Sequence, residues 1–176
     1  MAPSKTTTVD NLYLYDPDSK AQADKFVREA PKTSAASAVP NMAALVTITD
    51  TFEGLKFLIF DMHGKPGEFQ LPDKTVVSAA SLGLCATKNP RFVTANARIL
   101  FLGCKIGEGS KGELFMDEIG KSVLKGKGGI VGAAISSTFD FTLGPFVSDA
   151  YLPRWGKLRV FRYDEFGARV GAVTVP

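Results

Sequence analysis

Hydrophobic and polar positions follow two different periods along this chain. Continuous apolar runs at residues 55–61, 98–102 and 128–136 are each closed by glycine or other turn residues, which is typical of strands buried on both faces of a sheet. Residues 108–124 instead carry Phe115, Ile119 and Val123 at the spacing of one helical face. Because strands alternate with helices, the pattern predicts an α/β fold with an open, mostly parallel sheet and helices on both faces.

The remaining segments complete this prediction. Expected are a flexible tail at residues 1–10, a strand at 12–15, a helix from Asp18 or Ser19 to about residue 30, a loop at 32–40, a small β-excursion at 68–71 and 75–77, a helix at 78–89, and antiparallel strands at 155–161 and 169–175. Residues 41–53 fit either a helix or a strand, and Asn41 as a cap with Gly54 as a terminator favours the helix. Residues 11–176 then form one domain.

Composition narrows the range of functions. The chain has 176 residues, 45% hydrophobic and 22% charged, which is ordinary for a globular protein, and its net charge of +3 is too small and too dispersed to indicate a nucleic-acid partner. No apolar run approaches the ~20 residues of a membrane span, and the N-terminus lacks the apolar core of a signal peptide. We therefore expect a cytoplasmic chain, although a mature secreted form has the same composition.

Two strand ends carry the candidate chemistry. The first apolar strand ends in Asp61-Met62-His63-Gly64, with the only histidine of the chain, and the second ends in Gly103-Cys104-Lys105. A cysteine attacks as the thiolate, which a neighbouring base and a helix N-terminus near residue 108 both favour. Because parallel strands end at the same edge of a sheet, the pattern predicts a Cys104–His63 dyad.

The same residues also have an ordinary interpretation. A histidine at a strand end is commonly a hydrogen-bonded loop residue, and a cysteine after an apolar strand is commonly part of the core. Cys85, in an apolar helical segment without flanking strand ends, is interpreted as structural. One histidine and two distant cysteines do not form a usual zinc site, and no phosphate loop or dinucleotide fingerprint is present, so no metal or cofactor is predicted.

Two motif blocks resemble a known family. The segment MHGKPGEFQL at residues 62–71 resembles the Ser-His-Gly-x-Pro-Gly-x-x-x-Leu motif of a caspase-like domain found in large bacterial surface adhesins. The segment RILFLGCKIGEGSKGELFMDEIGK at residues 98–121 resembles the second motif of that domain, and WGKL at 155–158 is similar to its closing strand. The order of the motifs is that of the wider caspase-like cysteine peptidase clan, which includes gingipains, legumains, separase and CHAT domains.

The resemblance implies a three-layer caspase-like fold and a role for each matched residue. Cys104 would be the nucleophile, His63 the general base or acid, and the backbone N–H groups of Gly64 and Cys104 the oxyanion hole. It also implies Ser136, Ser137 and Thr138 as candidates for the substrate pocket. Met62 stands where the family has a small polar residue, so we expect its larger side chain to narrow the site or to reorient the imidazole.

Cysteine endopeptidase activity on a protein or peptide is the leading functional prediction. The preference for a substrate side chain stays open: Asp61, Asp140 and Asp149 would suit a basic residue, whereas Arg98, Lys105 and Arg154 would suit an acidic one. A catalytically inactive caspase-like module that binds a partner protein through the phenylalanines of residues 139–146 is the alternative. A small-molecule binder with a deep apolar pocket at the strand ends is a third class.

Overall fold

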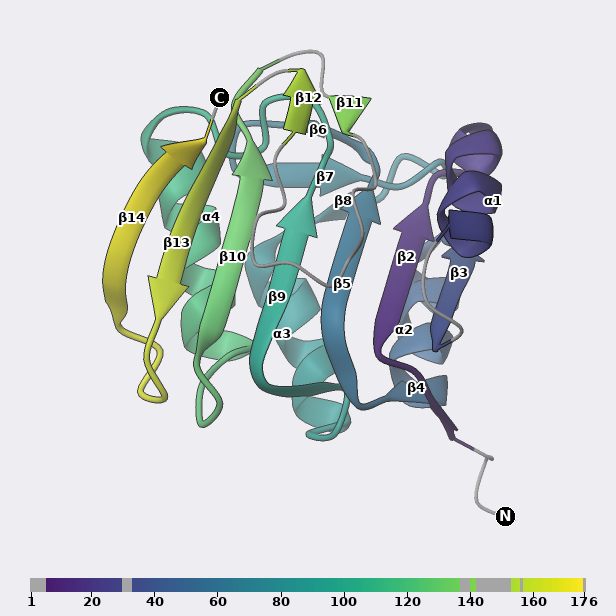
Figure 1. Ribbon diagram of the computed structural model, residues 1–176, viewed down its shortest axis with the longest axis horizontal. Coiled ribbons are helices and arrows are strands. Elements are labelled where there is room, and N and C mark those ends of the chain that lie inside the picture. Colours follow the sequence, from purple (N-terminus) through teal and green to yellow (C-terminus); the bar gives the residue numbers. More distant parts are fainter. Residues whose placement is uncertain (1–5, 30–32, 137–139, 142–152, 156, 176) are drawn as a thin grey trace.

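A seven-stranded mixed sheet forms the centre of the computed structural model, which describes residues 6–29, 33–136, 140–141, 153–155 and 157–175 (Figure 1). In spatial order the strands are β14 (Arg169–Val175), β13 (Leu158–Tyr163), β10 (Gly129–Ala134), β9 (Val93–Phe101), β5 (Leu55–Asp61), β2 (Asn11–Tyr15) and β3 (Ser34–Ala38). The five strands from β10 to β3 are parallel, and β13 pairs antiparallel with both β10 and β14. The predicted α/β class and the C-terminal antiparallel strands are confirmed.

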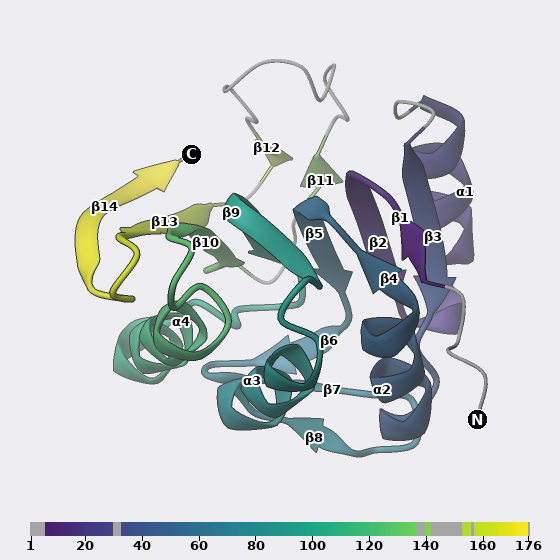
Figure 2. The same ribbon diagram turned by 90° about the horizontal axis from the view of Figure 1, so that it is seen from below.

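Helices lie on both faces of the sheet. Figure 2 shows α2 (Met42–Thr51), α3 (Ala79–Lys88) and α4 (Gly109–Ser122) on one face, and α1 (Lys20–Glu29) on the other. Helix α1 follows a short 3-10 helix, η1 (Pro17–Ser19), and packs against β2 and β3. The segment of residues 41–53 is therefore mainly helical, as the Asn41 cap predicted.

Local capping explains where the helices begin. The Asn41 side chain accepts a hydrogen bond from the Ala44 N–H at 2.9 Å, and the Ser78 hydroxyl accepts one from the Ser81 N–H at 3.3 Å. Each cap satisfies an N–H group that the first helical turn leaves without a partner, which is worth about 1 kcal/mol. Helices α2 and α3 therefore begin one residue after their caps.

The core lies mainly between the sheet and the three helices of one face. Phe60 of β5 stacks on Phe101 of β9 at 5.0 Å between ring centroids, and Phe115 of α4 meets Phe101 edge-on at 4.9 Å. All three side chains are buried, and burying each one stabilises the fold by roughly 1.5–3 kcal/mol. This aromatic cluster holds the carboxyl-terminal ends of β5 and β9 against the middle of α4.

The strand order reverses between β2 and β5, the place where open α/β sheets have a ligand-binding crevice. Strand β3 follows β2 in the chain and lies on one side of it, whereas β5 lies on the other side. The connection that leaves β2 and the connection that leaves β5 therefore run in opposite directions across the sheet. In open α/β sheets, ligands bind outside the carboxyl ends of the strands at such a position. Asp61, at the end of β5, lies at this position.

The predicted loop at residues 32–40 is wrong, because it contains β3. Ser34–Ala38 pairs in parallel with β2 over its whole length. Small residues such as Ala35 and Ser37 give a weak strand signal, yet the exposed edge of β2 supplies backbone partners for all five residues. The pairing with β2, and not side-chain propensity, therefore determines this strand.

Short strands form three additional small sheets. They are β1 (Thr7–Thr8) with β4 (Phe52–Glu53), β6 (His63–Lys65) with β7 (Glu68–Gln70) and β8 (Val76–Val77), and β11 (Asp140–Phe141) with β12 (Pro153–Trp155). The second of these is the predicted β-excursion after the histidine. Within the expected N-terminal tail, the structure thus shows Thr7 and Thr8 paired with β4.

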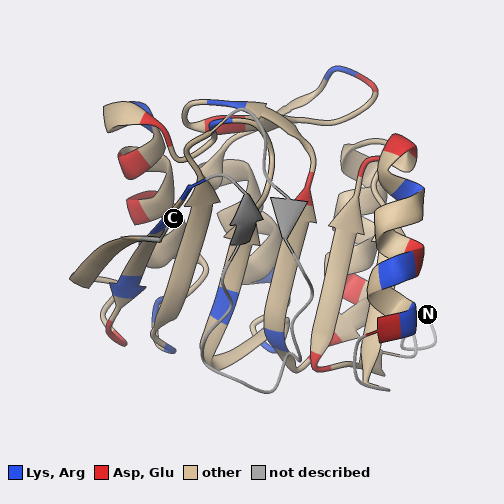
Figure 3. Cartoon of the chain, turned by 45° about the horizontal axis from the view of Figure 1, so that its top comes forward, with Lys and Arg blue, Asp and Glu red and all other residues tan. Residues whose placement is uncertain are grey.

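Charged side chains are interspersed over the surface. Figure 3 shows basic and acidic residues mixed along the helices and at the strand ends, without a large patch of one sign among the described residues. In that same part of the chain, no helix is long and apolar enough to cross a membrane.

Candidate active site

The ends of β5 and β9 run side by side and carry the two candidate catalytic residues beyond them. The Leu102 N–H donates to the Phe60 carbonyl oxygen at 2.8 Å, which continues the strand pairing to the last residues. Just beyond, the chains approach so closely that a Cβ atom on Gly103 would lie 2.1 Å from the Met62 carbonyl oxygen. His63 is the residue directly after Met62, and Cys104 is the residue directly after Gly103, so both candidate residues are next to this contact in sequence.

His63 is exposed and begins β6, the first strand of a hairpin. At its tip Gly67 has a φ of +85°, and its N–H donates to the Ile106 carbonyl oxygen at 3.0 Å. A Cβ atom on Gly64 would lie 2.3 Å from the Ile106 Cγ1 atom. The hairpin is therefore packed directly on the loop that carries Cys104, and a glycine after His63 is required by this packing.

Cys104 is exposed in the loop between β9 and α4. The next residue, Lys105, has a φ of +58°, in the left-handed region that lysine rarely occupies. The Lys105 N–H donates to the Ser136 carbonyl oxygen at 3.3 Å, and its carbonyl oxygen accepts from the Glu108 N–H at 2.9 Å. Helix α4 begins at Gly109, so Cys104 precedes a helix N-terminus as predicted.

Cys85 has a different environment. It lies in α3 with 3% of its surface exposed, and burial raises the pKa of its thiol. A buried thiol with a raised pKa is a poor nucleophile at neutral pH. The two cysteines form no disulfide, and the contrast agrees with the structural interpretation of Cys85.

Asp61 ends β5 and pairs with Tyr15, the last residue of β2. Burial raises the pKa of its carboxyl group, and the nearby Asp16 charge adds to the rise, whereas hydrogen bonds from Tyr13 and Ser19 and the charge of His63 oppose it. The Tyr13 hydroxyl donates to Asp61 Oδ2 at 2.7 Å. Asp61 is thus an acidic group, partly withdrawn from solvent, that ends β5 two residues before His63 begins β6.

Met62 does not narrow the site. Only 3% of its surface is exposed, and its side chain belongs to the core beneath the three helices. Alternation along the strand explains this placement, since Met62 follows Leu58 and Phe60 on one face while Ile59 contacts the core on the other. A small polar residue at this position would be buried, so an apolar side chain suits it.

The other candidates for the substrate pocket separate into three groups. Ser136 lies beside the Cys104 loop, where its hydroxyl accepts a hydrogen bond from the Lys157 N–H at 3.0 Å. Arg98 lies in register with Phe57 near the opposite end of the sheet, and is too far along β9 to serve the strand ends. The remaining candidates lie outside the described residues or have side chains that are not described: Ser137, Thr138, Asp140, Asp149 and Arg154.

The hairpin geometry bears on the predicted oxyanion hole. Lys65 and Glu68 flank a two-residue turn and form the pair next to it, so Gly64 and Phe69 form the following, non-hydrogen-bonded pair. The Gly64 N–H is therefore directed away from β7 and is not part of the hairpin ladder. A backbone donor beside His63, on the edge that faces the Cys104 loop, suits the stabilisation of a developing oxyanion.

Sequence reasoning missed the residues that shape the surroundings of the dyad. Ile106, Gln70 and Val76 carry no catalytic signature, and only the spatial pairing of β6, β7 and β8 brings the last two near His63. The alternation of residues in the hairpin is the one sequence signal for them. Among the described residues, no group of histidine, cysteine and acidic side chains could hold a metal ion.

No family model, curated protein or solved structure matches this chain.

Proposed function

We propose that the chain is a caspase-like cysteine endopeptidase that cleaves peptide bonds with a Cys104–His63 dyad. The observation that carries the proposal is the direct contact between the two strand ends, where Gly103 lies against the Met62 carbonyl oxygen. Both candidate side chains next to this contact are exposed. The finer assignment to a caspase-like fold rests on the motif resemblance and is supported by the mostly parallel sheet with a final antiparallel pair.

The reaction uses only groups of this chain and water. The Cys104 thiolate attacks the scissile carbonyl carbon, and the N–H groups of Gly64 and Cys104 face the resulting oxyanion. His63 gives a proton to the leaving amine, the C–N bond breaks, and a thioester remains on Cys104. His63 then removes a proton from water, which attacks the thioester and releases the acid.

A peptide carrying an electrophilic group tests the nucleophile. The wild type and Cys85→Ala are expected to be labelled, whereas Cys104→Ala is not, because Cys85 is buried with a raised thiol pKa. With a cleaved substrate, Cys104→Ala should lower kcat/KM by at least about 10⁴-fold. Mass spectrometry of the intact protein measures the labelling.

His63→Ala is the companion variant. It should reduce turnover strongly and leave the circular dichroism spectrum and thermal midpoint near those of the wild type, because the imidazole is exposed. Equal labelling of the wild type and Cys104→Ala would contradict the proposal.

Among the described residues, no observation specifically favours either of the two rival functions. The phenylalanines of the proposed partner-binding loop, such as Phe139 and Phe146, lie outside the described residues. At the described strand ends, the cavity beside His63 has a volume of about 150 Å³, below the ~300–1,000 Å³ of typical small-molecule pockets. We therefore advance the peptidase alone.

A further inference from the structure

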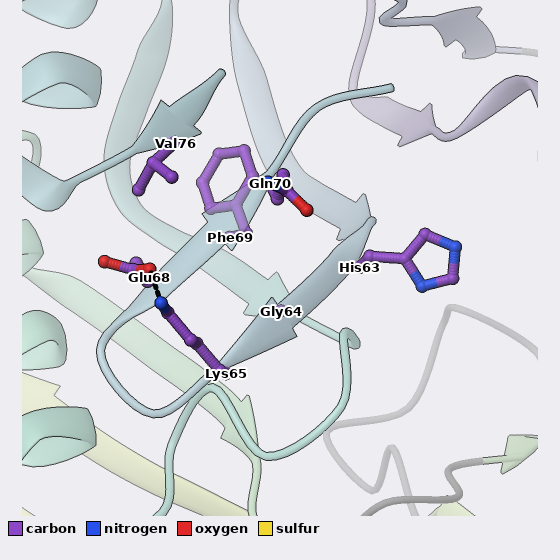
Figure 4. Close-up of a pocket in the computed structure, with 7 residues that line it drawn as sticks. All are labelled: His63, Gly64, Lys65, Glu68, Phe69, Gln70 and Val76. Atoms are coloured by element: carbon purple, nitrogen blue, oxygen red, sulfur yellow. Dashed lines mark ion pairs between the residues drawn. The ribbon is translucent and has the colours of Figure 1, made fainter. Parts of the chain in front are cut away.

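A shallow groove lies on the exposed face of the β6–β7–β8 sheet, next to His63. Its volume is about 150 Å³, and its lining includes His63, Lys65, Glu68, Phe69, Gln70 and Val76. Figure 4 shows the imidazole at one end of the hairpin, directed away from the other side chains drawn there. His63 thus forms one end of the groove.

The alternation of the hairpin creates this surface. Cross-strand pairing joins His63 with Gln70 and Lys65 with Glu68, which places these four side chains on one face. Gly64 and Phe69 belong to the opposite face, and the Phe69 ring is fully buried against Phe60 and Phe101. The floor of the groove is therefore anchored in the core and does not depend on surface side chains.

The groove is electrically balanced and partly apolar. Lys65 Nζ and Glu68 Oε1 form an ion pair at 2.7 Å (Figure 4), so their charges offset each other. Val76 is 46% exposed and offers an apolar wall. Such a surface suits an uncharged stretch of peptide better than a charged small molecule.

Strand β6 separates this groove from Cys104. The hairpin contacts the Cys104 loop on the side away from the groove, where Gly64 meets the Ile106 side chain and the Gly67 N–H donates to the Ile106 carbonyl oxygen. Strand β6 also pairs with β7, which leads to β8. His63, on β6, stands between the groove and the Cys104 loop. A substrate that reaches Cys104 and crosses β6 beyond His63 would run onto this groove.

We propose that the groove binds the substrate residues that follow the scissile bond, with an uncharged side chain against Val76. The inference rests on the proposed peptidase function. Since His63 protonates the leaving amine, the residues attached to that amine lie on the His63 side of the bond, away from Cys104. The segment that precedes the bond contacts other parts of the strand ends.

Two substrates with the same acyl side test this assignment. One is an aminocoumarin amide, which has no residue after the scissile bond, and the other is a quenched peptide with three uncharged residues after it. Val76→Arg fills the groove with a charged side chain and is expected to lower kcat/KM for the extended peptide by about tenfold, with the aminocoumarin amide within about twofold of wild type. Val27→Arg is the matched control, because Val27 is also 46% exposed but lies on α1.

A second pair of variants tests the charge balance without enlarging a side chain. Glu68→Gln leaves the Lys65 charge without its counterion and should favour extended peptides with an acidic residue after the bond, whereas Lys65→Gln should favour basic ones, each by about two- to threefold. Both residues are at the surface, so the fold should tolerate the changes.

The outcomes separate the inference from the function beneath it. Equal losses on both substrates for Val76→Arg, or no change in charge preference for the Lys65 and Glu68 variants, would overturn the groove assignment and leave the peptidase proposal standing. Failure of the wild type to cleave any substrate of a peptide library would overturn both.

Discussion

The two ends of the parallel sheet use their polar side chains in different ways. At the amino end, Lys127 Nζ donates to the carbonyl oxygens of Pro90 and Val93, and Asn89 Nδ2 donates to those of Thr49 and Phe52. At the carboxyl end, two polar side chains next to the strands, those of His63 and Cys104, are exposed. The amino end closes its loops with these hydrogen bonds, whereas the carboxyl end has hydrogen bonds of its own, as at Ser136, and also presents two candidate groups to solvent.

This difference separates stability from chemistry within one sheet. Each loop-closing bond at the amino end contributes roughly 1 kcal/mol, and removing its donor leaves carbonyl groups unsatisfied at a larger cost. At the carboxyl end the close approach of backbones, as between Gly103 and Met62, positions the two exposed side chains that follow it. Substitutions at the two ends should therefore differ in what they damage.

The largest contrast is expected from two glycines, one at each end. A Cβ atom on Gly103 would lie 2.1 Å from the Met62 carbonyl oxygen, and one on Gly129 would lie 2.3 Å from the Ala97 carbonyl oxygen. Alanine at either position should destabilise the fold by about 1–3 kcal/mol, because backbone must move. Only Gly103→Ala should also reduce kcat/KM, by about 100-fold, since it separates the strand ends that carry the dyad.

Urea unfolding gives the two free energies, and turnover is compared at a temperature where both variants are folded. Wild-type turnover in folded Gly103→Ala would show that the contact of the strand ends does not position the dyad.

A second contrast concerns pH. Burial raises the pKa of Asp61 at the carboxyl end, so between its ordinary pKa and the raised one the folded state binds more protons than the unfolded state, and stability falls as pH rises. Asp61→Asn removes this loss and can still accept the Tyr13 hydrogen bond, so its stability relative to wild type should increase as pH rises from about 4 toward 7.

Asp10, next to the amino end of β2, should change the stability with pH in the opposite direction, because its carboxyl pKa is lowered. Its hydrogen bond with Lys56, followed by that with Thr33, lowers its carboxyl pKa, so its contribution is present above the ordinary pKa and is lost as pH falls through the lowered one. Asp10→Asn should therefore lose stability relative to wild type as pH rises from the lowered pKa to about 4, and the difference should stay level from there toward pH 7. Parallel pH trends of the two variants would contradict the assignment of burial as the dominant cause at Asp61.

The smallest contrast compares two residues with positive φ. Lys105 has a φ of +58° next to Cys104, and Asn96 has +59° near the amino end of β9. Asparagine tolerates this conformation better than lysine, so Lys105→Gly should stabilise the fold by about 0.5–1 kcal/mol while Asn96→Gly changes it by less. Thermal unfolding measures both, and a destabilised Lys105→Gly would show that its ion pair with Glu108 outweighs the backbone strain.

Strong periodic patterns made much of this fold predictable. The apolar run at residues 55–61 coincides with β5, residues 169–175 coincide with β14, and the capped segment at 78–89 contains α3. These segments satisfy both their local propensity and their tertiary environment, so one pattern is sufficient. The prediction that the ends of β5 and β9 lie side by side required only that the two strands pair in parallel.

Other features depend on contacts that a linear pattern does not contain. Strand β9 begins at Val93, five residues before the predicted strand at Arg98, because Val93 pairs with Leu55 of β5 and Ala97 pairs with Gly129 of β10. The partners of Asp61, Tyr13 and Ser19, come from a strand and a helix that are distant in sequence. The groove beside His63 likewise needs three short strands whose pairing only the structure supplies.

The irregular pairing of β5 and β9 gives the site a tolerance to changes in chain length. Between the pairs Leu55–Val93 and Phe57–Arg98 lie four residues of β9 but only one residue of β5. If one of these four residues of β9 is deleted or another is inserted, the bulge changes its length, and the residues after Arg98 keep their pairing partners and their faces of the sheet. The same change within β9 after Arg98 would turn every following side chain to the opposite face, Cys104 included. The bulge therefore separates the two ends of the sheet: an insertion or deletion at the amino end of β9 leaves the position of Cys104 at the carboxyl end unchanged.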